Sequence, residues 1–212
     1  MSAPEAPPAG SPPLSPPQWD QTDRHGYLRG LRLLIQKLNG LFLRFVVFRG
    51  NKAAYLRHLG ARIGPECEIL AEVSAFGTEP WLIEIGRRVT ITHGVTFLTH
   101  DGASRLFRQR LPGSSPWGNR FGTIWIGDNS FVGANALLMP GIRIGPDSIV
   151  GAGSLVTHDV PPNTVVGGVP ARVLCSLDEY IARYQQKWVP VTAADRQALR
   201  RELTRQLWGE ER

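Results

Sequence analysis

Cysteine is nearly absent from this sequence, because only Cys67 and Cys175 occur in 212 residues. Two cysteines cannot build a disulfide-rich scaffold or a zinc cluster, so neither class of small domain applies. The sequence also lacks an apolar run near the roughly 18–20 residues that a membrane-spanning helix requires. Its first residues lack the basic start and apolar core of a secretory signal, so we expect a cytoplasmic protein.

Acidic residues are missing from residues 24–62, which hold nine lysines and arginines. The whole chain has a net charge of +6, so the remaining residues have a net charge of −3. The basicity is therefore local. No basic patch with a recognition motif accompanies it, and we expect no nucleic-acid partner.

The first 60 residues divide into two segments. Residues 1–22 form a tail that holds seven of the 17 prolines, and this composition predicts disorder. Residues 23–60 have helical periodicity with one apolar stripe, and residues 52–59 predict a further short helix. Arginines beside such a stripe are typical of a helix lying on an anionic membrane surface, so we expect peripheral contact of residues 24–50 with the inner membrane face. The alternative is a helix packed on the main domain with its arginines in water.

A period of six residues dominates the centre of the chain. Six aliphatic residues occupy every sixth position without a miss, namely Ile126, Val132, Leu138, Ile144, Val150 and Val156. Glycine follows four of them, and mostly small residues lie four positions after each. The same period is visible upstream at Ile63, Ile69, Ile85, Ile91 and Phe97. This period predicts a mainly β protein whose residues 61–175 form a parallel β-helix of about five coils, in which three short strands close each coil.

The period breaks once, between Phe97 and Ile126, which are 29 residues apart. This break predicts an excursion loop over residues 101–123, and a long loop in a compact repeat domain is usually functional. Residues 176–212 predict two helices. Ser176 and Glu179 form a capping box for the first, and Thr192 with Asp195 predicts a second. We expect both helices to cover the end of the β-helix.

Two stretches resemble a known family. The run IGDNSFVGANALLMPGIRIGPDSIVGAGSLVTHDVPPNTVVGGVPARV (126–173) resembles the hexapeptide-repeat acyltransferases, and FLTHDG (97–102) with Phe107–Arg108 resembles their capsule and exopolysaccharide O-acetyltransferases. The resemblance covers residues 60–186. It implies a left-handed β-helix, a homotrimer and acetyl-CoA as acyl donor. It also implies acetyl transfer to a hydroxyl of a sugar or glycan in polysaccharide or lipid-linked saccharide biosynthesis.

His100 is the candidate general base. It alone of the five histidines lies where the chain leaves the repeat, inside the FLTHDG segment. A hydroxyl is a poor nucleophile near neutral pH, whereas an imidazole can take its proton during a direct transfer without an acyl-enzyme. Asp101, Glu84 or a backbone carbonyl would orient the ring. Neighbouring side chains on a strand point to opposite faces, which counts against Asp101.

The resemblance also implies residues that contact the two substrates. The CoA-contacting positions correspond to Ala134, Ala152, Thr157, His158 and Arg172. A guanidinium matches phosphate geometry, which favours Arg172, whereas His158 stands where many relatives have lysine. The residues expected at the acceptor are Trp81, Arg105, Arg108 and Trp117. Aromatic rings there would support a sugar, and the arginines would either meet an acidic acceptor or form a solvated loop.

Three other functions are compatible with parts of the pattern. The γ-class carbonic anhydrases share the β-helix but need two histidines five residues apart, whereas His93 and His100 are seven apart, so we expect no metal. An N-acetyltransferase of an amino-sugar would use almost the same chemistry as an O-acetyltransferase. A non-catalytic β-helix scaffold is the third alternative, against which the FLTHDG segment and the CoA-like ending argue.

Overall fold

The computed structural model describes residues 37–40, 42, 48, 50–103, 106, 118–185 and 187–209. Its helices are α2 (Lys52–His58), η2 (Val73–Phe76), η3 (Pro80–Leu82), α4 (Leu177–Gln185) and α5 (Arg196–Trp208). Its first strands are β1 (Arg62–Ile63), β2 (Glu68–Ile69), β3 (Ile83–Ile85), β4 (Thr90–Ile91), β5 (Thr96–Phe97), β6 (His100–Asp101) and β7 (Arg120–Phe121). The later strands are β8 (Ile124–Ile126), β9 (Phe131–Val132), β10 (Leu137–Leu138), β11 (Ile142–Ile144), β12 (Ile149–Val150), β13 (Leu155–Val156), β14 (Thr164–Gly167) and β15 (Arg172–Ser176).

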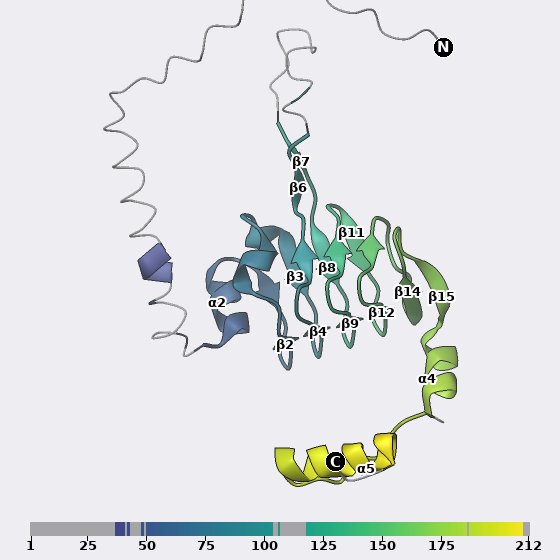
Figure 1. The fold of residues 1–212 in the computed structure, drawn as a ribbon. Coiled ribbons are helices and arrows are strands. Elements are labelled where there is room, and N and C mark those ends of the chain that lie inside the picture. The colour runs from purple at the N-terminus through teal and green to yellow at the C-terminus, as the bar shows by residue number, and fades with distance from the viewer. Residues whose placement is uncertain are drawn as a thin grey trace, which may run out of the picture.

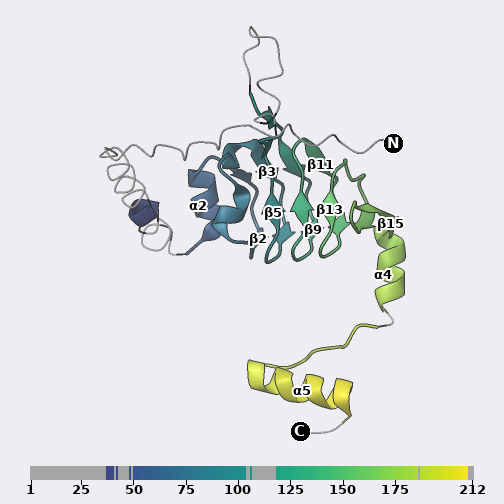
Figure 2. The ribbon, with the colours of Figure 1, turned by 45° about the horizontal axis from the view of Figure 1, so that its top comes forward.

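Three parallel sheets form the faces of a prism (Figures 1 and 2). The first face has the order β1–β3–β8–β11, the second runs from β2 through β4, β9 and β12 to β14, and the third is β5–β10–β13. The chain visits the three faces in turn, so each coil pairs with the coil before and after it. The expectation of a mainly β protein with a parallel β-helix is confirmed.

The six-residue period fills the axis of this prism. All six aliphatic residues from Ile126 to Val156 are buried, as are Ile85, Ile91 and Phe97 upstream. The small residues of the repeat are buried as well and fill the corners, namely Ser130, Ala136, Ser148 and Ser154. Successive side chains of a strand point inward and outward alternately. Each face of a coil therefore contributes one large residue to the axis, and a small residue fills the adjoining corner.

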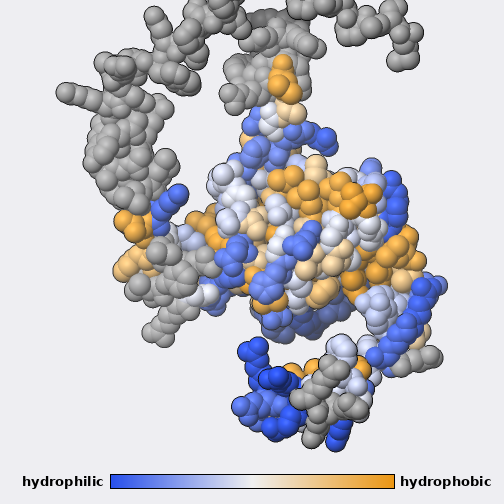
Figure 3. Space-filling view, viewed as in Figure 1, coloured by the Kyte–Doolittle hydropathy of each residue, from blue (hydrophilic) through white to orange (hydrophobic). Residues whose placement is uncertain are grey.

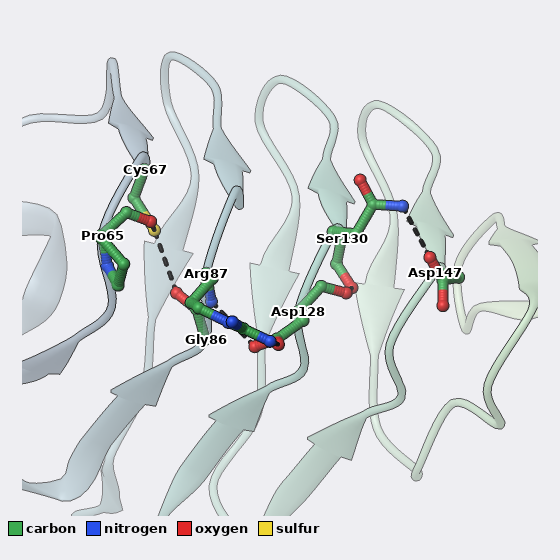
Figure 4. Close-up of polar contacts among 8 residues, drawn as sticks. Pro65, Cys67, Gly86, Arg87, Asp128, Ser130 and Asp147 are labelled. Atoms are coloured by element: carbon green, nitrogen blue, oxygen red, sulfur yellow. Dashed lines mark hydrogen bonds and ion pairs between the residues drawn. The ribbon is translucent and has the colours of Figure 1, made fainter.

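Glycine follows the aliphatic position because two coils approach closely there. A Cβ atom on Gly127 would lie 2.5 Å from the backbone nitrogen of Pro146, and one on Gly145 would lie 2.4 Å from that of Pro162. These glycines sit on the edge between the first and second faces, where side chains link successive coils (Figure 4). There Arg87 and Asp128 form an ion pair of 3.0 Å. Glycine is therefore required at 127 and 145 by close contact between coils.

The two ends of the prism are covered differently. At the N-terminal end α2 packs on β1 and β2, which confirms the short helix expected at residues 52–59. Residues 37–40 are also helical, but the tail and most of the basic segment lie outside the described residues. At the other end β15 pairs antiparallel with β14, and α4 packs on both.

The C-terminal helices differ in part from the expectation. The capping box is present, because Ser176 Oγ accepts from the Glu179 backbone N–H at 3.2 Å and Glu179 Oε2 accepts from that of Ser176 at 2.9 Å. Helix α5 begins instead after Asp195, whose side chain accepts from the Ala198 N–H. A carboxylate alone satisfies that N–H, so Thr192 is not needed as a cap. Figures 1 and 2 show α5 standing away from the prism, so it does not cover the end.

Candidate active site

A β-hairpin leaves the prism at the edge between its third and first faces (Figure 1). Its strands β6 and β7 follow β5 and precede β8. They pair with each other in antiparallel fashion, and His100 lies opposite Phe121. The loop expected at residues 101–123 therefore starts as a hairpin, of which residues 100–103, 106 and 118–123 are described. His100 is the first residue of this hairpin and lies where the chain departs from the repeat.

The imidazole of His100 contacts a carboxylate. Its Nδ1 lies 2.9 Å from Oε2 of Glu79, which precedes η3 in the preceding coil. The same Oε2 accepts a hydrogen bond of 2.7 Å from the buried hydroxyl of Thr99, and Oε1 accepts one of 2.6 Å from Thr78. The Glu79 side chain is only 16% exposed, whereas that of His100 is 36% exposed. The carboxylate is thus enclosed by donors, and the imidazole remains accessible.

These donors keep Glu79 ionised. Hydrogen bonds from Thr78 and Thr99, and to a smaller extent the contact with His100, outweigh the opposing effect of burial and lower the pKa of Glu79 to about 2. An ionised carboxylate only accepts hydrogen bonds, so the hydrogen on the imidazole must be at Nδ1. In the neutral ring, Nε2 then carries the lone pair. This is the tautomer that a general base requires.

Aromatic packing places Glu79 in this position. Phe76 of η2 stacks on Phe97 of β5 with ring centroids 4.4 Å apart, and both residues are buried. Gly77 follows with φ of +70°, a conformation that few other residues adopt, and it turns the chain toward Thr99. Glu79 then reaches His100 across 21 residues of sequence.

The structure corrects the expected partner of His100. The Asp101 carboxylate accepts a hydrogen bond of 2.8 Å from the Ala103 N–H, since it points to the opposite side of β6. Glu84 lies on the outside of the first face and pairs with Arg62 at 3.2 Å. One feature of the sequence indicates that the coil before His100 is irregular. Ile69 and Ile85 are 16 residues apart, which is not a multiple of six, so an irregular segment precedes Glu84.

Gly122 joins the hairpin to the prism, and a side chain at this position would displace the hairpin. The Gly122 N–H donates to the Thr99 carbonyl at 2.9 Å, and a Cβ atom would lie 2.3 Å from the Gly141 backbone nitrogen. We expect Gly122→Ala to destabilise the fold by about 1–3 kcal/mol, as overpacking does. It should also lower the transfer rate, because the shift includes His100. Thermal unfolding and steady-state kinetics measure both effects.

Gly102→Ala is the matched control for this variant. A Cβ atom on Gly102 meets no atom within 4 Å, although the residue belongs to the same hairpin. We expect its stability and activity to stay near those of the wild type. Equal losses in the two variants would show that close contact at Gly141 does not fix the hairpin.

Three of the residues expected to bind the donor lie together. Thr157, His158 and Arg172 line a hollow of about 400 Å³ whose walls include Val156, Val160 and Ala171. Thr157 Oγ1 lies 2.8 Å from Nδ1 of His158. The hollow is lined by residues just after β13, and His100 lies just after β5, at the same edge of the third face. In this sheet β10 lies between β13 and β5. The strand spacing places β5 and β13 about 9–10 Å apart across the sheet.

The other two expected donor residues lie at the opposite edge of the third face. Ala134 precedes β10, and Ala152 precedes β13 one coil later. The Ala134 carbonyl accepts from the Gly153 N–H at 2.7 Å, which stacks these two turns. The face between the two edges has outward-pointing Leu137 and Leu155, which are half-buried. Figure 3 shows apolar side chains gathered on the side of the prism from which the hairpin projects.

Of the expected acceptor residues, the structure describes one. Trp81 lies in η3, two residues after Glu79, and is exposed. Arg105, Arg108 and Trp117 lie outside the described residues. Sequence reasoning missed Phe121, whose ring centroid lies 5.5 Å from that of His100.

No group of three or more histidine, cysteine, aspartate or glutamate side chains that could hold a metal ion occurs in the described part of the chain. Among the helices described, none is long and apolar enough to cross a membrane.

Comparisons with known proteins identify the family. Residues 123–158 match the model of the bacterial transferase hexapeptide (six repeats). Protein CapG of Staphylococcus aureus is 46% identical over 141 residues, which cover 66% of this chain and 79% of that protein. The chain belongs to the hexapeptide-repeat transferases. The expected resemblance is confirmed, and the repeat of this family implies the left-handed β-helix.

Other hexapeptide-repeat transferases are similar over different lengths. The galactoside O-acetyltransferase of Escherichia coli is 44% identical over 64 residues, which are 30% of this chain and 32% of that protein. The structure of a hexapeptide-repeat acetyltransferase from Vibrio cholerae complexed with acetyl-CoA is 27% identical. It has a TM-score of 0.50 and covers 73% of this chain and 91% of that one. Together these relatives identify this hexapeptide-repeat transferase as an acetyltransferase that depends on acyl-CoA.

Proposed function

We propose that the protein transfers an acetyl group from acetyl-CoA to a hydroxyl of a sugar or glycan, with His100 as general base. The observation that carries this proposal is the contact between His100 Nδ1 and the ionised carboxylate of Glu79. It leaves Nε2 as the proton acceptor on an imidazole that is partly open to solvent. Capsule-related and galactoside-acetylating relatives support a saccharide as the acceptor.

The reaction follows from this arrangement in two steps. His100 Nε2 takes the proton of the acceptor hydroxyl while its oxygen attacks the thioester carbonyl carbon. The tetrahedral intermediate collapses with cleavage of the carbon–sulfur bond, and the imidazolium returns the proton to the departing thiolate. The products are an acetyl ester and free CoA. Glu79 stabilises the imidazolium between the two steps, as a carboxylate beside a catalytic histidine does.

The donor site is proposed along the edge that holds His100. Thr157, His158 and Arg172 would bind the polar end of CoA, since the guanidinium of Arg172 suits a phosphate. Ala134 and Ala152 would contact the donor across the third face. The CoA-bound relative from Vibrio cholerae supports a donor of this type.

An N-acetyltransferase is the second candidate. The 2,3,4,5-tetrahydropyridine-2,6-dicarboxylate N-acetyltransferase of Clostridium perfringens is 48% identical over 54 residues, although these are only 23% of that protein. An amine acceptor would use the same base. The match is confined to a short part of the repeat, so we place the sugar hydroxyl first.

The product distinguishes these functions. The full chain is incubated with acetyl-CoA and with glycosides, nucleotide sugars, lipid-linked sugars, polysaccharides and amino-sugars, and release of the CoA thiol is followed. We expect thiol release with a saccharide and a product that hydroxylamine cleaves, because it cleaves esters and leaves amides intact. A hydroxylamine-resistant product would identify an N-acetyltransferase. Failure to release CoA with every acceptor would favour the non-catalytic scaffold.

The assembly and the location in the cell are further parts of the proposal. The family resemblance supports a homotrimer. The basic residues between 24 and 50 support a cytoplasmic protein that contacts the inner face of the membrane. A saccharide acceptor linked to lipid would be assembled at that surface. Liposome flotation of the chain with and without residues 1–50 tests the contact.

A further inference from the structure

Phe121 presents an aromatic ring directly beside the proposed base. It lies opposite His100 in the register of β6 and β7. The two ring centroids are 5.5 Å apart with an angle of 45° between the planes, and Phe121 is 54% exposed. The transfer steps described above do not use this ring. Its place beside the imidazole makes it a candidate contact for the acceptor.

The backbone around Phe121 is held in place relative to His100. The next residue, Gly122, donates to the carbonyl of Thr99, which is adjacent to His100. Gly122 also packs against the backbone of Gly141, where a Cβ atom would not fit. The backbone that carries the Phe121 ring is therefore fixed relative to the backbone that carries His100. A ring on a fixed backbone is an effective binding surface because less conformational entropy is lost when a ligand contacts it.

The chemistry of the site indicates which part of an acceptor meets the ring. A hydroxyl that gives its proton to His100 must lie within about 2.6–3.2 Å of Nε2. The carbon skeleton that bears this hydroxyl then lies beside Phe121. A pyranose ring fits both requirements, since its hydroxyls project from its rim while its C–H groups form an apolar face.

We propose that Phe121 determines acceptor specificity by stacking against the C–H face of a pyranose ring whose hydroxyl is acetylated. The inference rests on the proposed function and names the acceptor class more narrowly, as a cyclic sugar rather than an open-chain alcohol or an amino acid. A linear polyol offers the same hydroxyls but no flat apolar face, so Phe121 contributes less to its binding.

The experiment compares Phe121→Leu with Phe121→Tyr in the full chain, using acetyl-CoA with methyl pyranosides and with a linear polyol such as mannitol. We expect Phe121→Leu to raise the KM for the pyranoside about tenfold, the scale of an aromatic contact. The KM for acetyl-CoA should stay near the wild-type value, and the effect on the polyol should be smaller. Phe121→Tyr should restore the pyranoside KM, since it restores the ring.

Each contrary result overturns the inference in a recognisable way. A change in the KM for acetyl-CoA alone would assign the ring to the donor. An equal loss of kcat with every acceptor would make Phe121 a positioning residue for the imidazole. Equal KM values for the leucine and tyrosine variants would exclude stacking. If the wild-type protein acetylates no pyranoside hydroxyl, the proposed function fails first, and the inference fails with it.

Discussion

Replacing His100 by alanine is expected to lower kcat by about 10²–10⁴, which is the usual contribution of general acid–base catalysis. The acceptor hydroxyl then has to lose its proton to water while it attacks the thioester. The KM for acetyl-CoA should change little, because the hollow lined by Thr157 and Arg172 lies on another coil. Steady-state release of the CoA thiol at saturating acceptor measures the effect.

His93→Ala is the control for this experiment. His93 is an exposed histidine of the prism that lies in the turn between β4 and β5, away from the hairpin. We expect it to retain wild-type kcat. If His100→Ala folds normally and transfers acetyl groups at the wild-type rate, His100 is not the base, and a different proton acceptor must be sought.

The second large effect is expected at Glu79. Glu79→Ala removes the acceptor that holds the hydrogen at Nδ1 and the charge that stabilises the imidazolium. We expect kcat to fall by about 10²-fold, at the low end of the range for His100→Ala, because the base itself remains. Glu79→Gln retains an amide oxygen for Nδ1–H but loses the charge, so its kcat should lie between those of the wild type and the alanine variant.

A purely structural role for Glu79 would give a different result. The alanine variant leaves the buried hydroxyl of Thr99 without its acceptor, which costs about 1–3 kcal/mol, so unfolding must be measured beside the kinetics. Glu84→Ala removes a glutamate that pairs with Arg62 on the outer face and should leave kcat unchanged. Lower stability of Glu79→Ala with an unchanged kcat would contradict the assignment of Glu79 as a positioning residue.

The repeat region of the fold is predictable from the sequence because its period is strict. Each sixth residue from Ile126 to Val156 is buried. Close contact with the next coil requires glycine after this position at 127 and 145. Helix α5 was less predictable. Its apolar stripe indicates a packed helix, but the position of a helix after an irregular linker depends on contacts that periodicity does not encode.

The candidate site is predictable only in part. His100 stands out because the period breaks beside it. Glu79 does not, since its role depends on η2 and η3, where the coil departs from the repeat, and on the stacking of Phe76 on Phe97. Phe121 comes next to His100 through the hairpin register. The sequence between them offers more than one turn signal, Asp101–Gly102 and Pro112–Gly113 among them, so it does not single out this register.

Strand β15 has a consequence for solubility. A parallel β-helix ends in unpaired backbone donors and acceptors, on which another copy could add its own strands and extend the stack into a fibre. Here the chain reverses after β14, so that β15 gives this strand an antiparallel partner, and α2 packs on β1 and β2 at the other end. At the C-terminal end the second face therefore finishes in an antiparallel strand, onto which another copy could not continue the parallel repeat.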